Sequence, residues 1–286
     1  MYSLIIENEK GEQLELTNNE SKFSVTSVEG LTPPSAEISI VDNIGDGAEF
    51  KHERTGKRNI VIDMNINGDV ETNRIELYRY VKNGKYLKIY FKTGSRNVWI
   101  DGYVETLEID NFSRNTVCQI SVLCPHPWWK DVQEVINSIN TIKGQFHFPF
   151  YTVEPIPFSI YETIQILNLI NSGDVSSGMT IEIYARGSIE NIKIFNRETS
   201  EYIGLGSVDN PYTLQAGDRV VITTHPNNKK IKLIRNAQET NIFNSLTPGS
   251  KFLQVGAGDN VFTYSAESGN EYIDITFKHY SQYEGV

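Results

Sequence analysis

The sequence contains little cysteine. Cys118 and Cys124 are the only two among its 286 residues. They belong to a run in which residues 118, 120, 122 and 124 are all apolar, so they would share one face of a β-strand. At ~3.3 Å per residue the two sulfur atoms would lie roughly 20 Å apart, which excludes a disulfide between them. Both are therefore predicted to be buried core residues in a reducing environment.

Long apolar runs and an excess of positive charge are also missing. No apolar run approaches the ~18 residues that a membrane span needs. The opening residues, Met1–Glu7, lack the basic and apolar parts of a signal peptide, so synthesis and folding in a cytoplasm are expected. The 36 acidic residues outnumber the 26 basic ones, for a net charge of −10. This balance disfavours phosphate backbones and anionic membrane surfaces, so we expect neither specific nucleic-acid binding nor membrane association.

Catalytic and metal-binding patterns are absent as well. The five histidines are scattered, and the P-loop, Rossmann and Gly-x-Ser-x-Gly patterns do not occur. A Cys/His metal site that included His126 would lack a second pair of ligands. Asp101 and Glu105 could form a carboxylate pair of the glycosidase kind, but a solvated strand face explains their spacing better. We predict no catalytic residue, no metal site, no cofactor and no enzymatic activity.

Two polar segments could hold a ligand or a partner, and both are interpreted as loops. The segment Asp42–Ala48 has the glycine and carboxylates of a calcium loop without the spacing, so a flexible polar loop is predicted. The segment Lys51–Arg58 is the strongest cationic run, but Glu53 interrupts it. It is predicted to be a solvated loop that could contact a polar partner.

The sequence is rich in residues that favour strands. Tyrosine (15) and phenylalanine (13) are numerous, and short alternating segments are separated by turn residues. A helix is predicted after the N-cap Asp69, with Val70, Leu77, Tyr78 and Val81 on one face and an end at Asn83-Gly84. Residues 1–128 are thus predicted to form a β-rich domain with one helix. Its predicted strands are Ser3–Ile6, Gln13–Leu16, Phe23–Val28, Ala36–Val41, Arg58–Ile66, Tyr86–Phe91, Val98–Ile109 and Thr116–Cys124.

A proline-rich break follows this domain. Its prolines remove backbone donors and end the sheet, and its adjacent tryptophans are expected to anchor a linker between domains. A sugar-stacking platform that also used Trp99 is the less favoured interpretation. The predicted anchor residues are Cys124, Pro125, Pro127, Trp128 and Trp129. Residues 129–164 are predicted to be a linker or wrapping arm, with a short helix over Val132–Ile139 and an aromatic–proline stretch over Phe146–Phe158.

Residues 165–286 are predicted to form an all-β domain. Candidate strands recur every 8 to 12 residues with turn residues between them, which is typical of a sandwich or jelly roll. They are Thr163–Leu169, Met179–Ala185, Ile189–Asn196, Glu201–Leu205, Tyr212–Leu214, Arg219–Thr224, Lys230–Arg235, Gly249–Val255, Asn260–Ser265 and Tyr272–Tyr280.

The order of these pieces resembles the distal tail proteins of long-tailed bacteriophages. The resemblance rests on the β-rich first domain with one helix, on Asp101–Glu105, and on the strand that ends in Val122–Trp129. It also rests on the closing segments Phe252–Asn260 and Ile273–Phe277, which are similar to the end of the family's galectin-like β-sandwich. The turn over Ala257–Asp259 is longer here than in the family pattern.

The resemblance implies a structural component of the virion tail tip, assembled in the host cytoplasm. Six copies would form a hub ring through their first domains, with the galectin-like sandwiches outside. A tail-tube or tail-terminus protein would bind one side, and a tail-associated baseplate or fibre protein the other. DNA would pass through the ring without specific binding. The alternatives are a carbohydrate- or receptor-binding module that acts through the C-terminal sandwich and, less favoured, a glycoside hydrolase.

Overall fold

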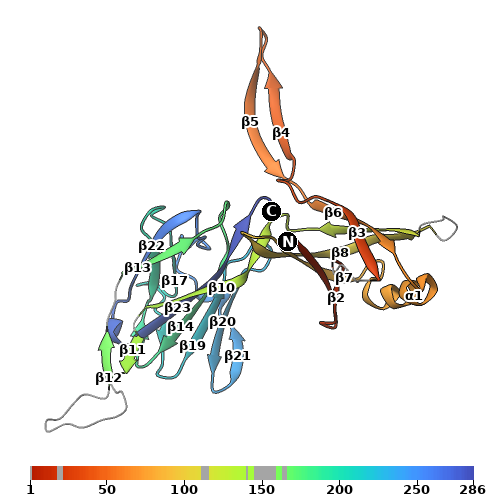
Figure 1. The fold of residues 1–286 in the computed structure, drawn as a ribbon. Coiled ribbons are helices and arrows are strands. Elements are labelled where there is room, and N and C mark those ends of the chain that lie inside the picture. Colours follow the sequence, from red (N-terminus) through yellow and green to blue (C-terminus); the bar gives the residue numbers. More distant parts are fainter. Residues whose placement is uncertain (1, 18–21, 111–115, 140, 145–158, 163–165) are drawn as a thin grey trace. The chain divides into compact units, whose positions relative to one another are not determined.

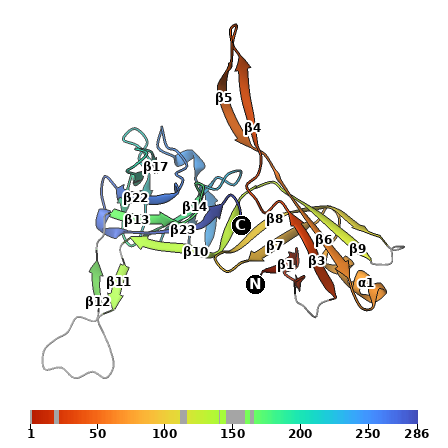
Figure 2. The same cartoon turned by 45° about the horizontal axis from the view of Figure 1, so that its top comes forward.

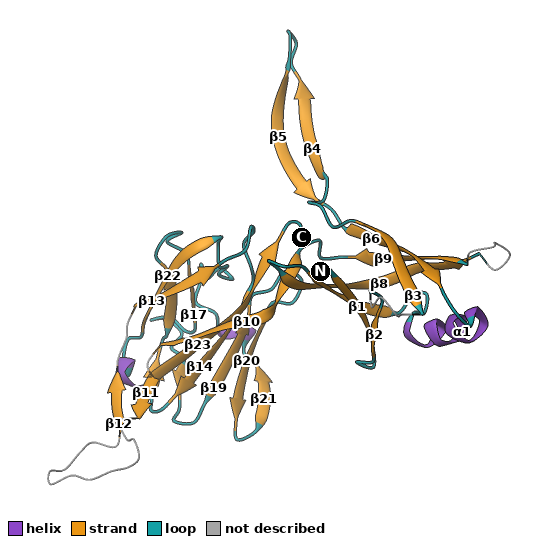
Figure 3. Ribbon diagram, in the orientation of Figure 1, coloured by secondary structure: helices purple, strands orange, loops and turns teal. Residues whose placement is uncertain are grey.

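The computed structural model describes residues 2–17, 22–110, 116–139, 141–144, 159–162 and 166–286. The chain divides into two compact units, one of Met1–Val132 with Gln282–Val286 and the other of Gln133–Ser281. Antiparallel strands dominate both units, and the single α-helix of the described residues lies in the first (Figure 1, Figure 3). The predicted mainly β fold class is confirmed.

The first unit is a twisted antiparallel sheet with one helix beside it (Figure 2). Its strands are paired in the order β2-β1-β7-β8-β10. A second series of pairings starts at β8, which also pairs with β9; β9 pairs with β6, and β6 pairs with β3. Strand β10 (Trp129–Ile139) begins in this unit and continues in the second, while β23 (Ile273–Tyr283) ends in it. The elements are β1 (Ser3–Asn8), β2 (Gln13–Glu15), β3 (Phe23–Glu29), β4 (Ala36–Asp42), β5 (Ala48–Thr55), β6 (Arg58–Ile66), α1 (Val70–Tyr80), β7 (Tyr86–Lys92), β8 (Asn97–Ile109) and β9 (Val117–Cys124).

The core of the first unit follows from strict alternation along its strands. On β6, Ile60, Ile62 and Met64 are fully buried while their neighbours are not. Cys118 and Cys124 are buried on the same side of β9 and are free, as predicted. Burial raises the pKa of both thiols to about 12, so they are protonated at neutral pH and act as small apolar core residues.

Helix α1 begins where it was predicted to begin, but its end and the residues of its apolar face differ from the prediction. Asp69 caps it, because its carboxylate accepts hydrogen bonds from the backbone N–H and the hydroxyl of Thr72. The helix ends at Tyr80, before the predicted Asn83-Gly84. Leu77 is buried as expected, but Tyr78 is exposed, so its assignment to the apolar face is wrong.

The second unit is a β-sandwich with two principal sheets. One has the order β10-β23-β14-β19-β20-β21 and the other β13-β22-β16-β17. Their inner faces meet in one core, where the rings of Phe262 and Phe277 lie 5.3 Å apart. The remaining elements are β11 (Thr141–Gly144), β12 (Ser159–Glu162), β13 (Ile166–Asn171), β14 (Met179–Ala185), β15 (Ile189–Glu190), β16 (Lys193–Asn196), β17 (Tyr202–Gly204), β18 (Thr213–Leu214), β19 (Arg219–Thr223), β20 (Lys230–Arg235), β21 (Gln238–Asn241), η1 (Phe243–Ser245), β22 (Gly258–Ser265) and η2 (Asn270–Tyr272).

Two predicted strands of this unit need correction, and one observed strand was not predicted. The segment predicted over Ile189–Asn196 is divided into β15 and β16, because Asn191 has a positive φ of 51°. The segment Gly249–Val255 is no strand, and only Val255 forms an isolated bridge, to Ser177. Strand β21 was not predicted, since Gln238–Asn241 has no apolar residue. These errors arise where a turn or an edge interrupts the alternation that sequence reasoning relies on.

The predicted linker over residues 129–164 contains strands. The short helix predicted over Val132–Ile139 is wrong: these residues belong to β10, which pairs with β8 at its start and with β23 further on. The apolar spacing of this segment fits a helix, but hydrogen bonds to two partner strands outweigh it. Of the aromatic–proline stretch, residues 146–158 lie outside the described residues.

Candidate assembly interface

A two-stranded arm is the most exposed part of the first unit. Strands β4 and β5 pair only with each other among the described strands, from Ala36–Thr55 at the base to Asp42–Ala48 at the tip (Figure 1, Figure 3). The prediction of a loop over Asp42–Ala48 fits the tip of the arm. The loop predicted over Lys51–Arg58 is wrong, because β5 extends to Thr55 and β6 begins at Arg58.

The arm carries apolar side chains that nothing described in the chain covers. Ile40 and Phe50 face each other across the strands and are 60% and 56% exposed. Ile38, Val41 and Ile44 at the tip are exposed too. Full burial of one such side chain contributes about 1.5–3 kcal/mol, and an isolated hairpin is marginally stable in water. Exposed apolar side chains on one face of a hairpin, as Ile38, Ile40 and Phe50 are, are typical of a protein–protein interface.

The ion pairs on the arm contribute little to the stability of the hairpin. Arg54 pairs with Glu37 at 2.9 Å and Lys51 with Glu49 at 2.7 Å, and all four side chains are largely exposed. Exposed pairs contribute about 0–1 kcal/mol each. Burial of the apolar side chains against another surface would supply a much larger stabilisation, so the arm is suited to assembly.

The base of the arm is fixed by one buried arginine. Arg58 donates hydrogen bonds to the carbonyl oxygens of Gly30 at 2.6 Å and Thr32 at 3.1 Å, and also to that of Glu284. Burial lowers its pKa, but an arginine remains charged at physiological pH. Its guanidinium lies 6.0 Å from the ring centre of Trp129. The arginine thus ties the start of β6 to the chain before the arm and to the C-terminal residues.

Gly30 is required at this base. Its φ is +83°, and a Cβ atom there would lie 2.2 Å from the carbonyl oxygen of Asn59. Arg96 provides a second tie, since it donates to the carbonyl oxygen of Gly285 and lies 4.3 Å from the ring centre of Tyr283. The last residues of the chain are therefore part of the first unit.

The predicted anchor residues occupy different environments. Cys124 and Trp129 are fully buried in the core of the first unit, and the ring of Trp129 lies 6.3 Å from that of Phe91. Pro125 is exposed, whereas Pro127 and Trp128 are partly buried. Trp129 thus holds the start of β10 in the first unit. Its predicted role between domains stays a prediction.

The residues considered for chemistry have structural partners in the first unit. Asp101 is paired with Lys130 at 3.1 Å, and Glu105 accepts a hydrogen bond from Ser121 at 3.0 Å. The ring of Trp99 has ammonium groups near it, that of Lys88 at 4.0 Å and that of Lys130 at 4.4 Å. Among the described residues no group of three His, Cys, Asp or Glu side chains is placed to hold a metal ion. The one described helix is too short and polar to cross a bilayer.

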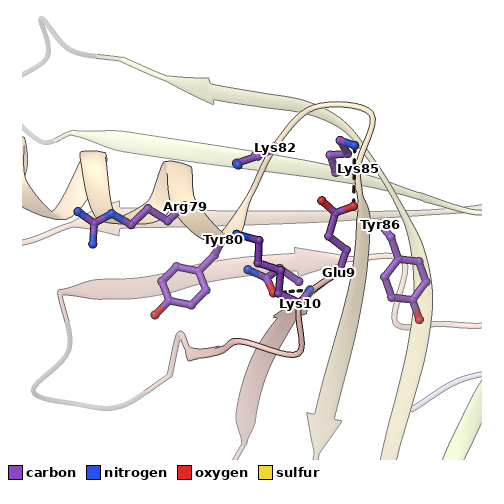
Figure 4. Close-up of a pocket in the computed structure, with 8 residues that line it drawn as sticks. Glu9, Lys10, Arg79, Tyr80, Lys82, Lys85 and Tyr86 are labelled. Atoms are coloured by element: carbon purple, nitrogen blue, oxygen red, sulfur yellow. Dashed lines mark hydrogen bonds and ion pairs between the residues drawn. The ribbon is translucent and has the colours of Figure 1, made fainter.

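A small basic pocket lies where the β1–β2 turn meets the C-terminal end of α1 (Figure 4). Lys85 lies 3.9 Å from Glu9, and within the described part of the chain Lys10, Arg79 and Lys82 have no carboxylate partner. In a chain of net charge −10 this cluster can attract an anionic group, although the macrodipole of α1 already favours cations at this end. The lining residues are Asn8, Glu9, Lys10, Arg79, Tyr80, Lys82, Lys85 and Tyr86.

Sequence reasoning predicted the first strand of the arm, Ala36–Val41, but missed its second strand and the arginine clamp. Ile38 and Ile40 alternate with polar residues, which is a strand signal, whereas the charged residues around Phe50 concealed the second strand. For Arg58 no local signal exists, because its partners lie 26, 28 and 226 residues away in sequence.

Comparison with known proteins identifies the fold. Residues 172–280 match the family model of the siphovirus-type tail component, C-terminal domain. No curated protein matches the chain in sequence. The structure is similar to the crystal structure of the Dit protein of phage SPP1, described as a paradigm of the hub adsorption apparatus in phages that infect Gram-positive bacteria. The TM-score is 0.69 at 14% identity, over 98% of each chain.

Two baseplate structures of phage P2 in the activated conformation are also similar. The one with calcium has a TM-score of 0.57 at 12% identity, and the one with strontium a TM-score of 0.54 at 11% identity, each over 100% of both chains. These similarities establish a shared fold over the whole chain. The resemblance to the distal tail proteins that the sequence predicts is confirmed.

Proposed function

We propose that this chain is a structural component of a phage tail tip, in which six copies form a hub ring between the tail tube and the host-adsorption apparatus. The proposal is supported by the fold that the chain shares with hub and baseplate proteins and by the family match of residues 172–280. The copies assemble through their first units. A tail-tube or tail-terminus protein binds one side of the ring, and a baseplate or fibre protein the other.

The observation that carries the proposal is the exposed apolar arm. A protein that functioned as a monomer would have to keep Ile38, Ile40 and Phe50 in water. In a closed ring each arm is covered by the next copy, and no arm is left over, because rotational symmetry repeats the same contact around the ring. The arm then acts as a connector, and the protein needs no catalytic group.

The net charge of −10 suits a ring around a DNA channel. An acidic protein does not displace the counterions of DNA, so DNA could pass without being held. The virion tail tip is then the final location, and assembly takes place in the host cytoplasm before release.

Light scattering on the purified chain over a range of concentrations tests the proposal. We expect a hexamer for the natural sequence and a monomer for a variant with Ile38→Ser, Ile40→Ser and Phe50→Ser. A matched control, Ile170→Ser, removes an equally exposed isoleucine from the sandwich and should leave the hexamer intact. A natural protein that stays monomeric at every concentration would contradict the ring, and a triple variant that still forms hexamers would contradict the role of the arm.

A further inference from the structure

The second unit contains a groove along the outer edge of its larger sheet, with both apolar and polar lining residues. It lies over β20, the edge strand β21 and the start of η1, and has a volume of about 390 Å³. This volume is within the range of small-molecule sites in proteins. The residues that line it are Lys229, Lys230, Ile231, Lys232, Glu239, Thr240, Asn241 and Phe243.

One end of the groove is an aromatic ring held in a fixed position. Phe243 is stacked on Phe252, with ring centres 5.8 Å apart and planes 25° apart. The backbone N–H of Phe243 donates to Oδ1 of Asn241 at 3.0 Å. Lys229 lies 5.3 Å from the ring centre of Phe252, yet Phe243 remains 42% exposed. An exposed aromatic ring in a fixed position offers a platform on which the C–H face of a saturated ligand ring can stack.

The rest of the groove carries an excess of positive charge. Lys232 and Glu239 neutralise each other at 2.6 Å. Lys229 and Lys230 have no carboxylate partner among the described residues. Asn241 is paired with Lys232 across the strands, and its side chain, whose Oδ1 already accepts a hydrogen bond, adds amide hydrogens. In a chain with a net charge of −10 this is a local site for an anion beside an aromatic platform.

We propose that this groove binds an acidic saccharide. The sugar ring stacks on Phe243, its hydroxyl groups bond to Asn241, and its carboxylate or phosphate group is held by Lys229 and Lys230. Extended peptides fit less well, because β21 is an edge strand of only four residues and offers few backbone groups for strand addition. Long nucleic acids are disfavoured by the charge of the chain as a whole.

NMR titration of the full chain with glucuronate, glucose and acetate tests this inference. Glucuronate should shift the amide signals of Thr240, Asn241 and Phe243 at lower concentration than glucose or acetate. It alone has both a sugar ring that can stack on Phe243 and a carboxylate that the lysines can bind. Phe243→Ala should weaken glucuronate binding about tenfold, whereas Lys230→Glu should remove the preference for glucuronate over glucose. The control Tyr184→Ala removes a similarly exposed ring on β14 and should change nothing.

Several results would overturn the inference. Absence of shifts in the groove with glucuronate would do so, and so would equal shifts with acetate, which would indicate a simple anion site. Tighter binding of adenosine monophosphate or of an extended peptide would assign the groove to another ligand class. Thermal unfolding of each variant establishes that it is folded. The outcome is independent of the ring, because the titration reads the second unit whether or not the chain is a hexamer.

Discussion

Two hairpins of the described chain, β4–β5 and β20–β21, are built in opposite ways. In β20 the alternate residues Ile231 and Leu233 are buried in the sandwich core. In β5 every residue from Ala48 to Arg54 is exposed, so no described part of the chain covers the apolar side chains of the arm. A hairpin with one buried face is stabilised by its own domain. A hairpin with two exposed faces, one of them apolar, depends on a partner.

The largest effect is expected where a hairpin side chain is buried. Ile231→Ala should destabilise the second unit by about 2–5 kcal/mol, because it removes apolar contacts and leaves a cavity. Hydrogen exchange of the amides of β19 and β20 measures this unit directly. A loss below about 0.5 kcal/mol would mean that β20 is held mainly by its backbone hydrogen bonds.

The clamp at the base of the arm should come next. Arg58→Met keeps the apolar stem but loses the bonds to Gly30, Thr32 and Glu284, so the first unit should lose about 2–3 kcal/mol. Tryptophan fluorescence during denaturant unfolding reports this unit alone, because Trp99, Trp128 and Trp129 all belong to it. Arg58→Lys is the control, which retains the charge without the planar donor group and should recover only part of the loss.

The second unit should weaken in mild acid. His279 is fully buried on β23, and burial lowers its pKa below the usual 6.5. The unfolded chain therefore binds a proton more readily than the folded one. The stabilisation is fully present above about pH 6.5 and is lost as the pH falls toward the folded pKa, by up to about 1.4 kcal/mol per pH unit. Thermal unfolding at about pH 5.5 and about pH 7.5 should show this loss, and His279→Leu should abolish the contribution. An unchanged pH dependence in that variant would assign it to other groups.

The smallest effect on stability is expected in the arm. Ile40→Ser should change the unfolding free energy of a monomeric form by less than about 0.5 kcal/mol, since the side chain is already in water. Fluorescence-detected unfolding at low protein concentration measures this. A loss similar to that of Ile231→Ala would show that the arm is stabilised from within its own chain, and the contrast between the two hairpins would fail.

How far the sequence predicts this molecule depends on the range of the interactions. The alternation of apolar and polar residues predicted the bounds of β6, β14 and β20, because a strand with one buried face has a clear sequence pattern. The start of α1 was predictable for the same reason, because the N-cap Asp69 bonds to a residue only three positions away. Strand β10 was not predictable in this way, since its apolar spacing fits a helix and only its partner strands decide. The clamp of Arg58 and the edge strand β21 likewise depend on chain segments that come together only in the fold.

The same distinction applies to the candidate interface. The absence of catalytic and metal patterns, together with the order of the domains, was sufficient to indicate a structural role. In the arm that we propose as the interface, Ala36–Val41 was predicted as a strand, but the second strand was taken for a loop, because Phe50 stands alone among charged and polar neighbours and lacks the signature of a core strand. An interface residue packs against a partner chain, and the sequence of one chain holds no information about the surface of that partner.

Negative-stain imaging of the purified natural chain tests the central claim most directly. Six copies around a central opening are predicted, and the rings should disappear in the variant with Ile38→Ser, Ile40→Ser and Phe50→Ser. A field of single-chain particles from the natural protein, at concentrations where light scattering also detects only monomer, would contradict the account.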